Sequence, residues 1–95
     1  MQNLDPEMLK QVQERSAMLQ QRMTEMRIEG SAGSDDLRVT VVINGKHEAM
    51  AVHISPSLLE QSMEMLQELT ASAITDAAHK LEEQLQREFL SAFGQ

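Results

Sequence analysis

Two long segments without a helix breaker constrain the fold of this chain more than any other feature. Asp5-Pro6 is a favourable start for a helix, because aspartate caps the first turn and proline suits the first helical position. No glycine or proline follows before Gly30, and a second uninterrupted segment covers residues 58–90. We therefore predict helices over residues 5–26 and 58–90.

A narrow apolar seam follows the first of these helices. Its members are three and four residues apart, as in a heptad pattern: Leu9, Val12, Ser16, Leu19, Met23 and Met26. A helix of this length extends about 32 Å, which is too long and too narrowly apolar for a simple lid on a small core. We expect it to pair with another helix along part of its length.

Between the helices the hydrophobic period changes to that of a strand. Apolar and other residues alternate over residues 37–43, and Asn44-Gly45 is a strong hairpin signal, because a type I′ turn needs positive φ at both positions. Such a turn places Val41 opposite Glu48. Together with a weaker strand upstream, the pattern predicts a three-stranded antiparallel meander. The expected strands are residues 27–33, 36–44 and 46–55.

The last helix carries an apolar stripe that rotates around its axis. Its first half contains small residues, including Ala73 and Ala77, which can lie close against the sheet. Its second half, with Leu81, Leu85 and Phe89, must then face another helix, either the first helix or one from a partner subunit. The hairpin face with Thr40, Val42, Ala49 and Ala51 is either covered by a second copy or open to water.

These elements predict an α+β fold of order α-β-β-β-α, formed by one domain over residues 1–95, with two long helices projecting from a small sheet. A core of this size would be marginal alone, so we expect a dimer. The chain lacks cysteine, which excludes disulfides and thiolate chemistry. His47 and His53 are too far apart on one strand to share a metal ion. We expect no metal, cofactor, catalytic residue or small-molecule substrate, no membrane segment, and a cytoplasmic location.

The net charge of −7 argues against a general nucleic-acid coat. The charge is unevenly distributed, however: residues 1–28 are neutral overall, whereas residues 59–95 carry −5. Arg15 and Arg22 lie one heptad apart in the first helix and share a face. They form intrahelical pairs or flank the helical seam, or else they contact phosphates, and the sequence leaves these interpretations open.

The chain resembles the YbaB/EbfC family of bacterial nucleoid-associated proteins. The similarity rests on the order and spacing of several segments: 18–23 (MLQQRM), 29–33 (EGSAG), 39–45 (VTVVING), 52–59 (VHISPSLL), 64–69 (EMLQEL) and 73–77 (AITDA). The resemblance implies a tweezer-like homodimer that binds double-stranded DNA with little sequence preference and organises the bacterial nucleoid or regulates gene expression. Ser55 and Thr75 depart from the residues common in the family, which are aspartate and asparagine.

The family pattern assigns no base-reading residue, so the candidate DNA contacts come from charge and geometry. They are Lys10, Arg15 and Arg22 on the first helix and Lys80 and Arg87 on the last. The alternative is a small acidic dimer that binds other proteins, as an assembly chaperone does, through its methionine-rich surface.

Overall fold

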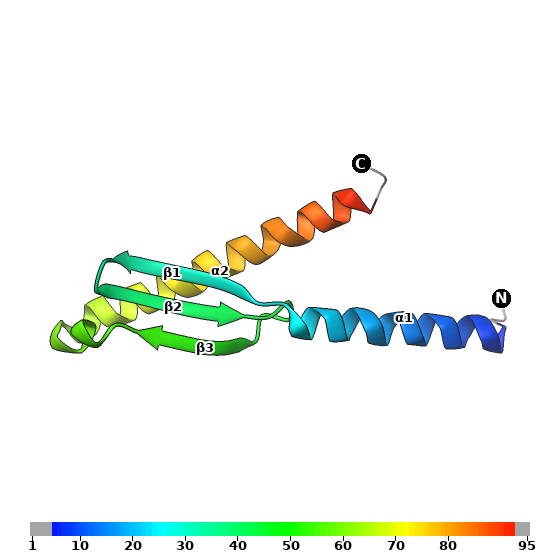
Figure 1. The fold of residues 1–95 in the computed structure, drawn as a ribbon, viewed down its shortest axis with the longest axis horizontal. Coiled ribbons are helices and arrows are strands. Elements are labelled where there is room, and N and C mark those ends of the chain that lie inside the picture. Colours follow the sequence, from blue (N-terminus) through cyan, green and yellow to red (C-terminus); the bar gives the residue numbers. More distant parts are fainter. Residues whose placement is uncertain (1–4, 93–95) are drawn as a thin grey trace.

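The computed structural model describes residues 5–92 and has the predicted α-β-β-β-α order (Figure 1). The strands form one antiparallel sheet in the order β1-β2-β3. The elements are α1 (Pro6–Glu25), β1 (Ile28–Ser34), β2 (Leu37–Ile43), β3 (Ala49–Ile54), the 3-10 helix η1 (Pro56–Glu60) and α2 (Met63–Ser91).

The core lies between the sheet and α2. From β2 it takes Val39 and Val41, and from α2 it takes Ala73 and Ala77, all of them buried. Gly30 of β1 permits the close approach of the helix, because a Cβ atom there would lie 2.3 Å from the backbone nitrogen of Ala77. The small residues of α2 therefore lie against the sheet, as predicted.

The second half of α2 differs from the prediction. Leu81, expected to face another helix, is fully buried in the same core, and Leu85 packs partly against it. The reason is the start of the helix. η1 precedes α2, and Ser62 caps α2 by accepting a hydrogen bond from the Met65 backbone nitrogen, so α2 begins at residue 63 rather than 58. Its contact with the sheet is correspondingly displaced toward its C-terminus.

The register between β2 and β3 also differs from the prediction. Val41 pairs with Val52 rather than with Glu48, and Val39 pairs with Ile54. From Val39 to Val42 the displacement is four residues, an even number, so the paired side chains stay on the faces to which they were assigned; at Ile43, which pairs with Ala49, the displacement is three. Between Val42 and Ile43 the register shifts by one residue, because their partners are Ala51 and Ala49 and β3 contains one extra residue there.

The cause is a loop built around Asn44 instead of a two-residue turn. Asn44 is fully buried, and its Oδ1 accepts hydrogen bonds from the backbone nitrogens of Lys46 and Glu48 at 2.8 and 3.0 Å. The non-glycine residue with positive φ in this loop is His47, at 64°. Gly45 is required for another reason, because its backbone lies against the end of α1, with its nitrogen donating to the Met23 carbonyl at 2.7 Å.

Helix α1 projects from the sheet as a separate arm (Figure 1). None of its residues is buried, so the expected pairing with another helix does not occur within the described residues 5–92. Its C-terminus is held beside the loop between β2 and β3 by the Gly45 contact, and Arg27 caps it locally, with Nη1 donating to the carbonyls of Thr24 and Met26.

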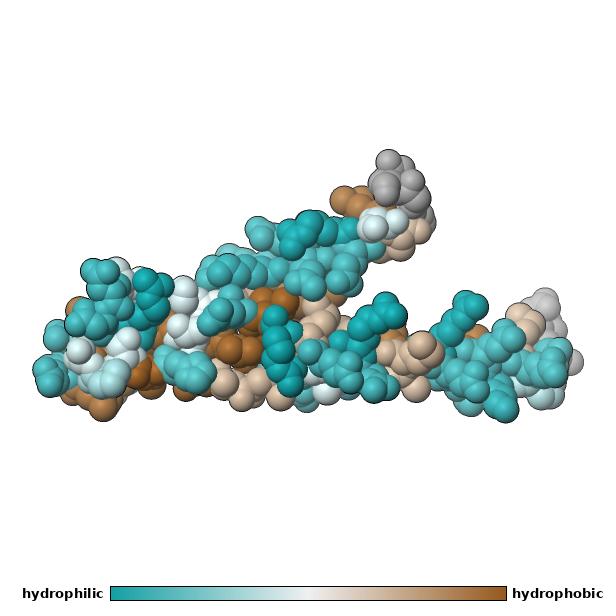
Figure 2. All heavy atoms as spheres, viewed as in Figure 1, coloured by the Kyte–Doolittle hydropathy of each residue, from teal (hydrophilic) through white to brown (hydrophobic). Residues whose placement is uncertain are grey.

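The two arms make the molecule elongated. It measures 63 × 27 × 22 Å, and its radius of gyration is 18.9 Å, whereas a compact chain of this length has about 12 Å. Both α1 and the C-terminal part of α2 extend to the same end of the sheet and diverge from one another (Figure 1). In Figure 2, hydrophobic residues gather at the base of the gap between the arms, and hydrophilic residues dominate the visible surface of the arms.

Candidate nucleic-acid interface

The three basic residues predicted on α1 are exposed along the projecting arm. Lys10, Arg15 and Arg22 form no ion pair with any residue of the described range 5–92. The intrahelical pairs considered from the sequence are therefore not formed by these three side chains within this range, whereas a position beside the apolar seam and a contact with phosphates both stay open. Three cations on a surface that no other part of the described chain contacts remain available for an external anion.

Their positions around the helix differ. Arg15 and Arg22 are separated by about 20° around the axis and by about 10 Å along it, so they form one basic strip. Both flank the apolar seam, at about 40–60° from Leu19. Lys10 lies about 180° from Leu19, on the opposite side of the helix. Arg15 and Arg22 can therefore touch one anionic backbone together, whereas Lys10 points elsewhere.

The two basic residues of α2 have different surroundings. Lys80 is held by the protein itself: its Nζ lies 3.0 Å from Oδ2 of Asp76 and donates to the Glu29 carbonyl at 3.3 Å. The side chain remains 51% exposed, so the ammonium group still faces solvent. Arg87 is exposed and has no ion pair within residues 5–92.

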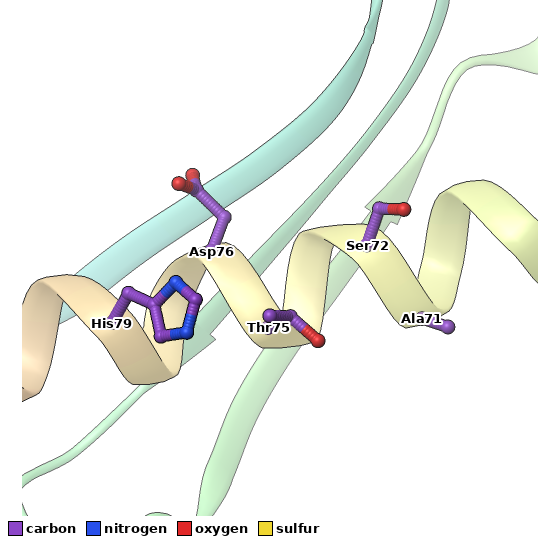
Figure 3. Close-up of a pocket in the computed structure, with 5 residues that line it drawn as sticks. All are labelled: Ala71, Ser72, Thr75, Asp76 and His79. Atoms are coloured by element: carbon purple, nitrogen blue, oxygen red, sulfur yellow. The ribbon is translucent and has the colours of Figure 1, made fainter.

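Asp76 links α2 to the edge of the sheet. Its Oδ2 accepts a hydrogen bond from the Ser31 backbone nitrogen at 3.0 Å, and Figure 3 shows the carboxylate pointing toward β1. This backbone hydrogen bond, together with the bond and charge of Lys80, lowers the pKa of the Asp76 carboxyl below its usual value, because each stabilises the charged form. The i,i+4 spacing of Asp76 and Lys80 is a signal for their pairing, but the part played by Ser31 could not be read from the sequence.

A shallow hollow lies beside Asp76 on the surface of α2. Its lining consists of Ala71, Ser72, Thr75, Asp76 and His79 (Figure 3). No hydrogen bond joins the His79 imidazole to either hydroxyl within the described part of the chain, so the hollow contains no paired nucleophile and base. Among residues 5–92, no group of three or more histidine, aspartate and glutamate side chains is arranged to hold a metal ion. None of the described helices is both long and apolar enough to cross a membrane.

Two comparisons with known proteins agree with this architecture. The solved structure of an uncharacterized protein, HP0035 from Helicobacter pylori, is similar in fold, with a TM-score of 0.69 and 23% sequence identity. The match covers 97% of this chain and 100% of that protein. The model of the YbaB/EbfC DNA-binding family matches residues 1–95. Because this match extends over the whole sequence, the chain belongs to the YbaB/EbfC DNA-binding family.

Proposed function

We propose that this chain binds double-stranded DNA as a homodimer with little sequence preference, in the bacterial nucleoid, and thereby organises the nucleoid or regulates gene expression. The observation that carries the proposal is the strip formed by Arg15 and Arg22, which lies unpaired on a projecting arm of a chain that belongs to a DNA-binding family. Guanidinium groups hold phosphates through bidentate, charge-assisted hydrogen bonds. Contacts of this kind position a protein on the duplex without reading its sequence.

The exposed surface supports the dimer. The accessible surface of the chain is 7418 Å², whereas a compact monomer of this mass exposes about 5500 Å². The excess exceeds the roughly 800 Å² that each partner buries in a standard interface. Much of it is apolar, including Leu9, Val12 and Leu19 in the seam of α1.

The acidic charge of α2 shapes the mode of binding that we propose. Because the negative residues are concentrated on α2, the duplex would approach the α1 arms and avoid most of α2. If the seam of α1 is buried against a second copy, Arg15 and Arg22 lie at the margin of that contact and stay accessible. Binding of this kind is weak and strongly dependent on salt.

The test is a titration of a labelled duplex at low and moderate salt with the wild type and with Arg15→Glu/Arg22→Glu. We expect the double variant to bind more weakly and the slope of log K against log salt to fall by about 1 for each lost phosphate contact. Arg38→Glu/Lys46→Glu reverses the same number of charges on the sheet and its loop, and serves as the matched control. An equal loss in the control would contradict the assignment to α1. Absence of wild-type binding at low salt would overturn DNA binding and favour a protein-binding dimer.

A further inference from the structure

We propose that Asn44 is a site of spontaneous deamidation, that the attachment of α1 keeps it from reacting, and that its modification prevents this attachment from forming again. The attachment consists of the hydrogen bond from the Gly45 nitrogen to the Met23 carbonyl and of the Met26 sulfur beside Gly45. We call this contact the α1 joint. The inference is independent of DNA binding and of the proposed homodimer.

The sequence Asn44-Gly45 is the pair of residues most prone to deamidation. Glycine carries no side chain that would hinder its own nitrogen, and it adopts backbone conformations that other residues rarely reach. The Gly45 nitrogen loses its proton to hydroxide and bonds to Cγ of Asn44. The bond from Cγ to Nδ2 breaks, and Nδ2 takes a proton from water and leaves as ammonia. Water then opens the resulting succinimide at either carbonyl, which yields aspartate or isoaspartate without any oxidant or reductant.

The α1 joint opposes the first step of this reaction. The Gly45 nitrogen donates to the Met23 carbonyl at 2.7 Å. The lone pair that would attack lies in the peptide plane, where the proton was, so it points at the Met23 oxygen rather than at Asn44. A deprotonated nitrogen would also face the lone pairs of that oxygen, which disfavours loss of the proton. The reaction therefore requires the joint to open.

The folded loop also restrains the amide that would be attacked. Asn44 is fully buried, which keeps hydroxide and water from its side chain. Its Oδ1 accepts from the backbone nitrogens of Lys46 and Glu48, and its Nδ2 donates to Oε1 of Glu48 at 2.7 Å. Two donors on Oδ1 polarise the carbonyl. The loop thus leaves the amide electrophilic and protects it by position and burial alone.

The products do not fit the same loop. An aspartate at position 44 replaces Nδ2, a donor, by an oxygen that faces Oε1 of Glu48. Two buried carboxylates at this separation repel one another when both are charged. Isoaspartate inserts a methylene group into the backbone of the loop. Either product disturbs the loop that presents the Gly45 nitrogen to α1, so the modification irreversibly marks a chain whose α1 joint has opened.

The rate of deamidation in the folded and the unfolded chain tests the protection. The wild type is incubated at mildly alkaline pH with and without denaturing urea, and its peptides are analysed by mass spectrometry and for isoaspartate. At Asn44 we expect the folded chain to react at least about tenfold more slowly. Asn3 precedes the bulky Leu4 and serves as the internal control, with a slow reaction in both conditions. Equal rates at Asn44, or no reaction there in urea, would overturn the proposal.

Matched methionine variants test whether the α1 joint provides the protection. Met23→Ala/Met26→Ala removes the side chains beside Gly45 and leaves the reacting pair of residues unchanged. Met8→Ala/Met18→Ala removes two exposed methionines elsewhere on the same helix. In the folded chain, the first variant should accelerate deamidation by about threefold or more, because the joint opens more often. The second should keep the wild-type rate, and the same rate in both variants would show that the joint is not the restraint.

Asn44→Asp tests the effect of the modification on α1. Hydrogen exchange of the Gly45 amide should become at least about tenfold faster, because the loop no longer holds this nitrogen against the helix. In Asn44→Asp/Glu48→Gln a glutamine amide can donate to the new carboxylate, so the hydrogen bond forms again with donor and acceptor exchanged and protection should return. Wild-type protection in Asn44→Asp, or a loss that the second substitution leaves unchanged, would overturn the proposed effect.

Discussion

Helices α1 and α2 both carry an apolar stripe, but only α2 finds its partner within the chain. α2 buries Ala73, Ala77 and Leu81 against the sheet, whereas no residue of α1 is buried. The difference lies in the side chains at the contact. Two alanines of α2 meet Gly30 of β1, so the backbones approach closely. The seam of α1, apart from Ser16, carries larger Leu, Val and Met side chains, with no comparable surface of the described residues beside them. Periodicity identifies the apolar face of each helix, but it does not show whether the rest of the chain covers that face.

The matched substitutions Leu81→Ala and Leu19→Ala test this difference most strongly. Leu81 is fully buried, so its truncation should lower the free energy of unfolding by about 2–5 kcal/mol. Leu19 is 56% exposed, and its truncation should leave subunit unfolding almost unchanged while weakening the proposed dimer. Urea denaturation and sedimentation equilibrium measure the two effects. Equal loss of unfolding free energy in the two variants would mean that α1 is as well packed in solution as α2.

Glycine positions beside the two helices provide a second matched pair. Gly30→Ala places a methyl group 2.3 Å from a backbone atom of α2, which cannot move aside independently, and should lower the free energy of unfolding by about 1–3 kcal/mol. At Gly45 the nearest atom is the Met26 sulfur, at the flexible end of a side chain, and the Met23 carbonyl follows at 2.9 Å. We expect Gly45→Ala to cost less than Gly30→Ala. Chemical denaturation of both variants measures the two losses of unfolding free energy. A larger loss in Gly45→Ala would show that the contact of Gly45 with α1 is the more rigid of the two.

Lowering the pH should destabilise the contact between α2 and β1 more than the contact between α1 and Gly45. The folded pKa of Asp76 lies below the usual value of an aspartate, so its contribution to stability is complete above that usual value and is lost as the pH falls through the folded pKa. Asp76→Asn should therefore reduce the thermal midpoint at pH 6 by a small amount, and the difference from the wild type should shrink below about pH 4. A difference that stays constant across this range would argue against a charged Asp76 in the folded protein.

The helices, the strands and most of the core were predictable because each depends on local spacing. Val39, Val41 and the alanines of α2 lie where the alternation and the four-residue stripe placed them. The hairpin register was not predictable, because the preference of Asn44-Gly45 for a tight turn is overridden by two tertiary effects. One is the burial of Asn44 among loop nitrogens, and the other is the contact of Gly45 with α1.

For the candidate site, the sequence shows the positions of the charges but not the contacts that their side chains make. The charges and spacing of Arg15 and Arg22 are visible in the sequence, but their lack of ion pairs depends on side-chain positions. The role of Lys80 required the fold, because Glu29 is distant in sequence and only the packing of α2 on β1 brings its carbonyl within reach.

The contact between Gly45 and the end of α1 makes the β2–β3 loop the point about which α1 can tilt relative to the sheet. At this point the Gly45 nitrogen donates one hydrogen bond to the Met23 carbonyl. The helix that extends from it has 20 residues and is about 30 Å long. A tilt of about 10° at this joint would move the far end of the helix by about 5 Å. The same tilt would move the backbone at Arg15 by about 2 Å and at Lys10 by about 3 Å, so a small rearrangement of the loop changes the positions of the basic residues on the arm.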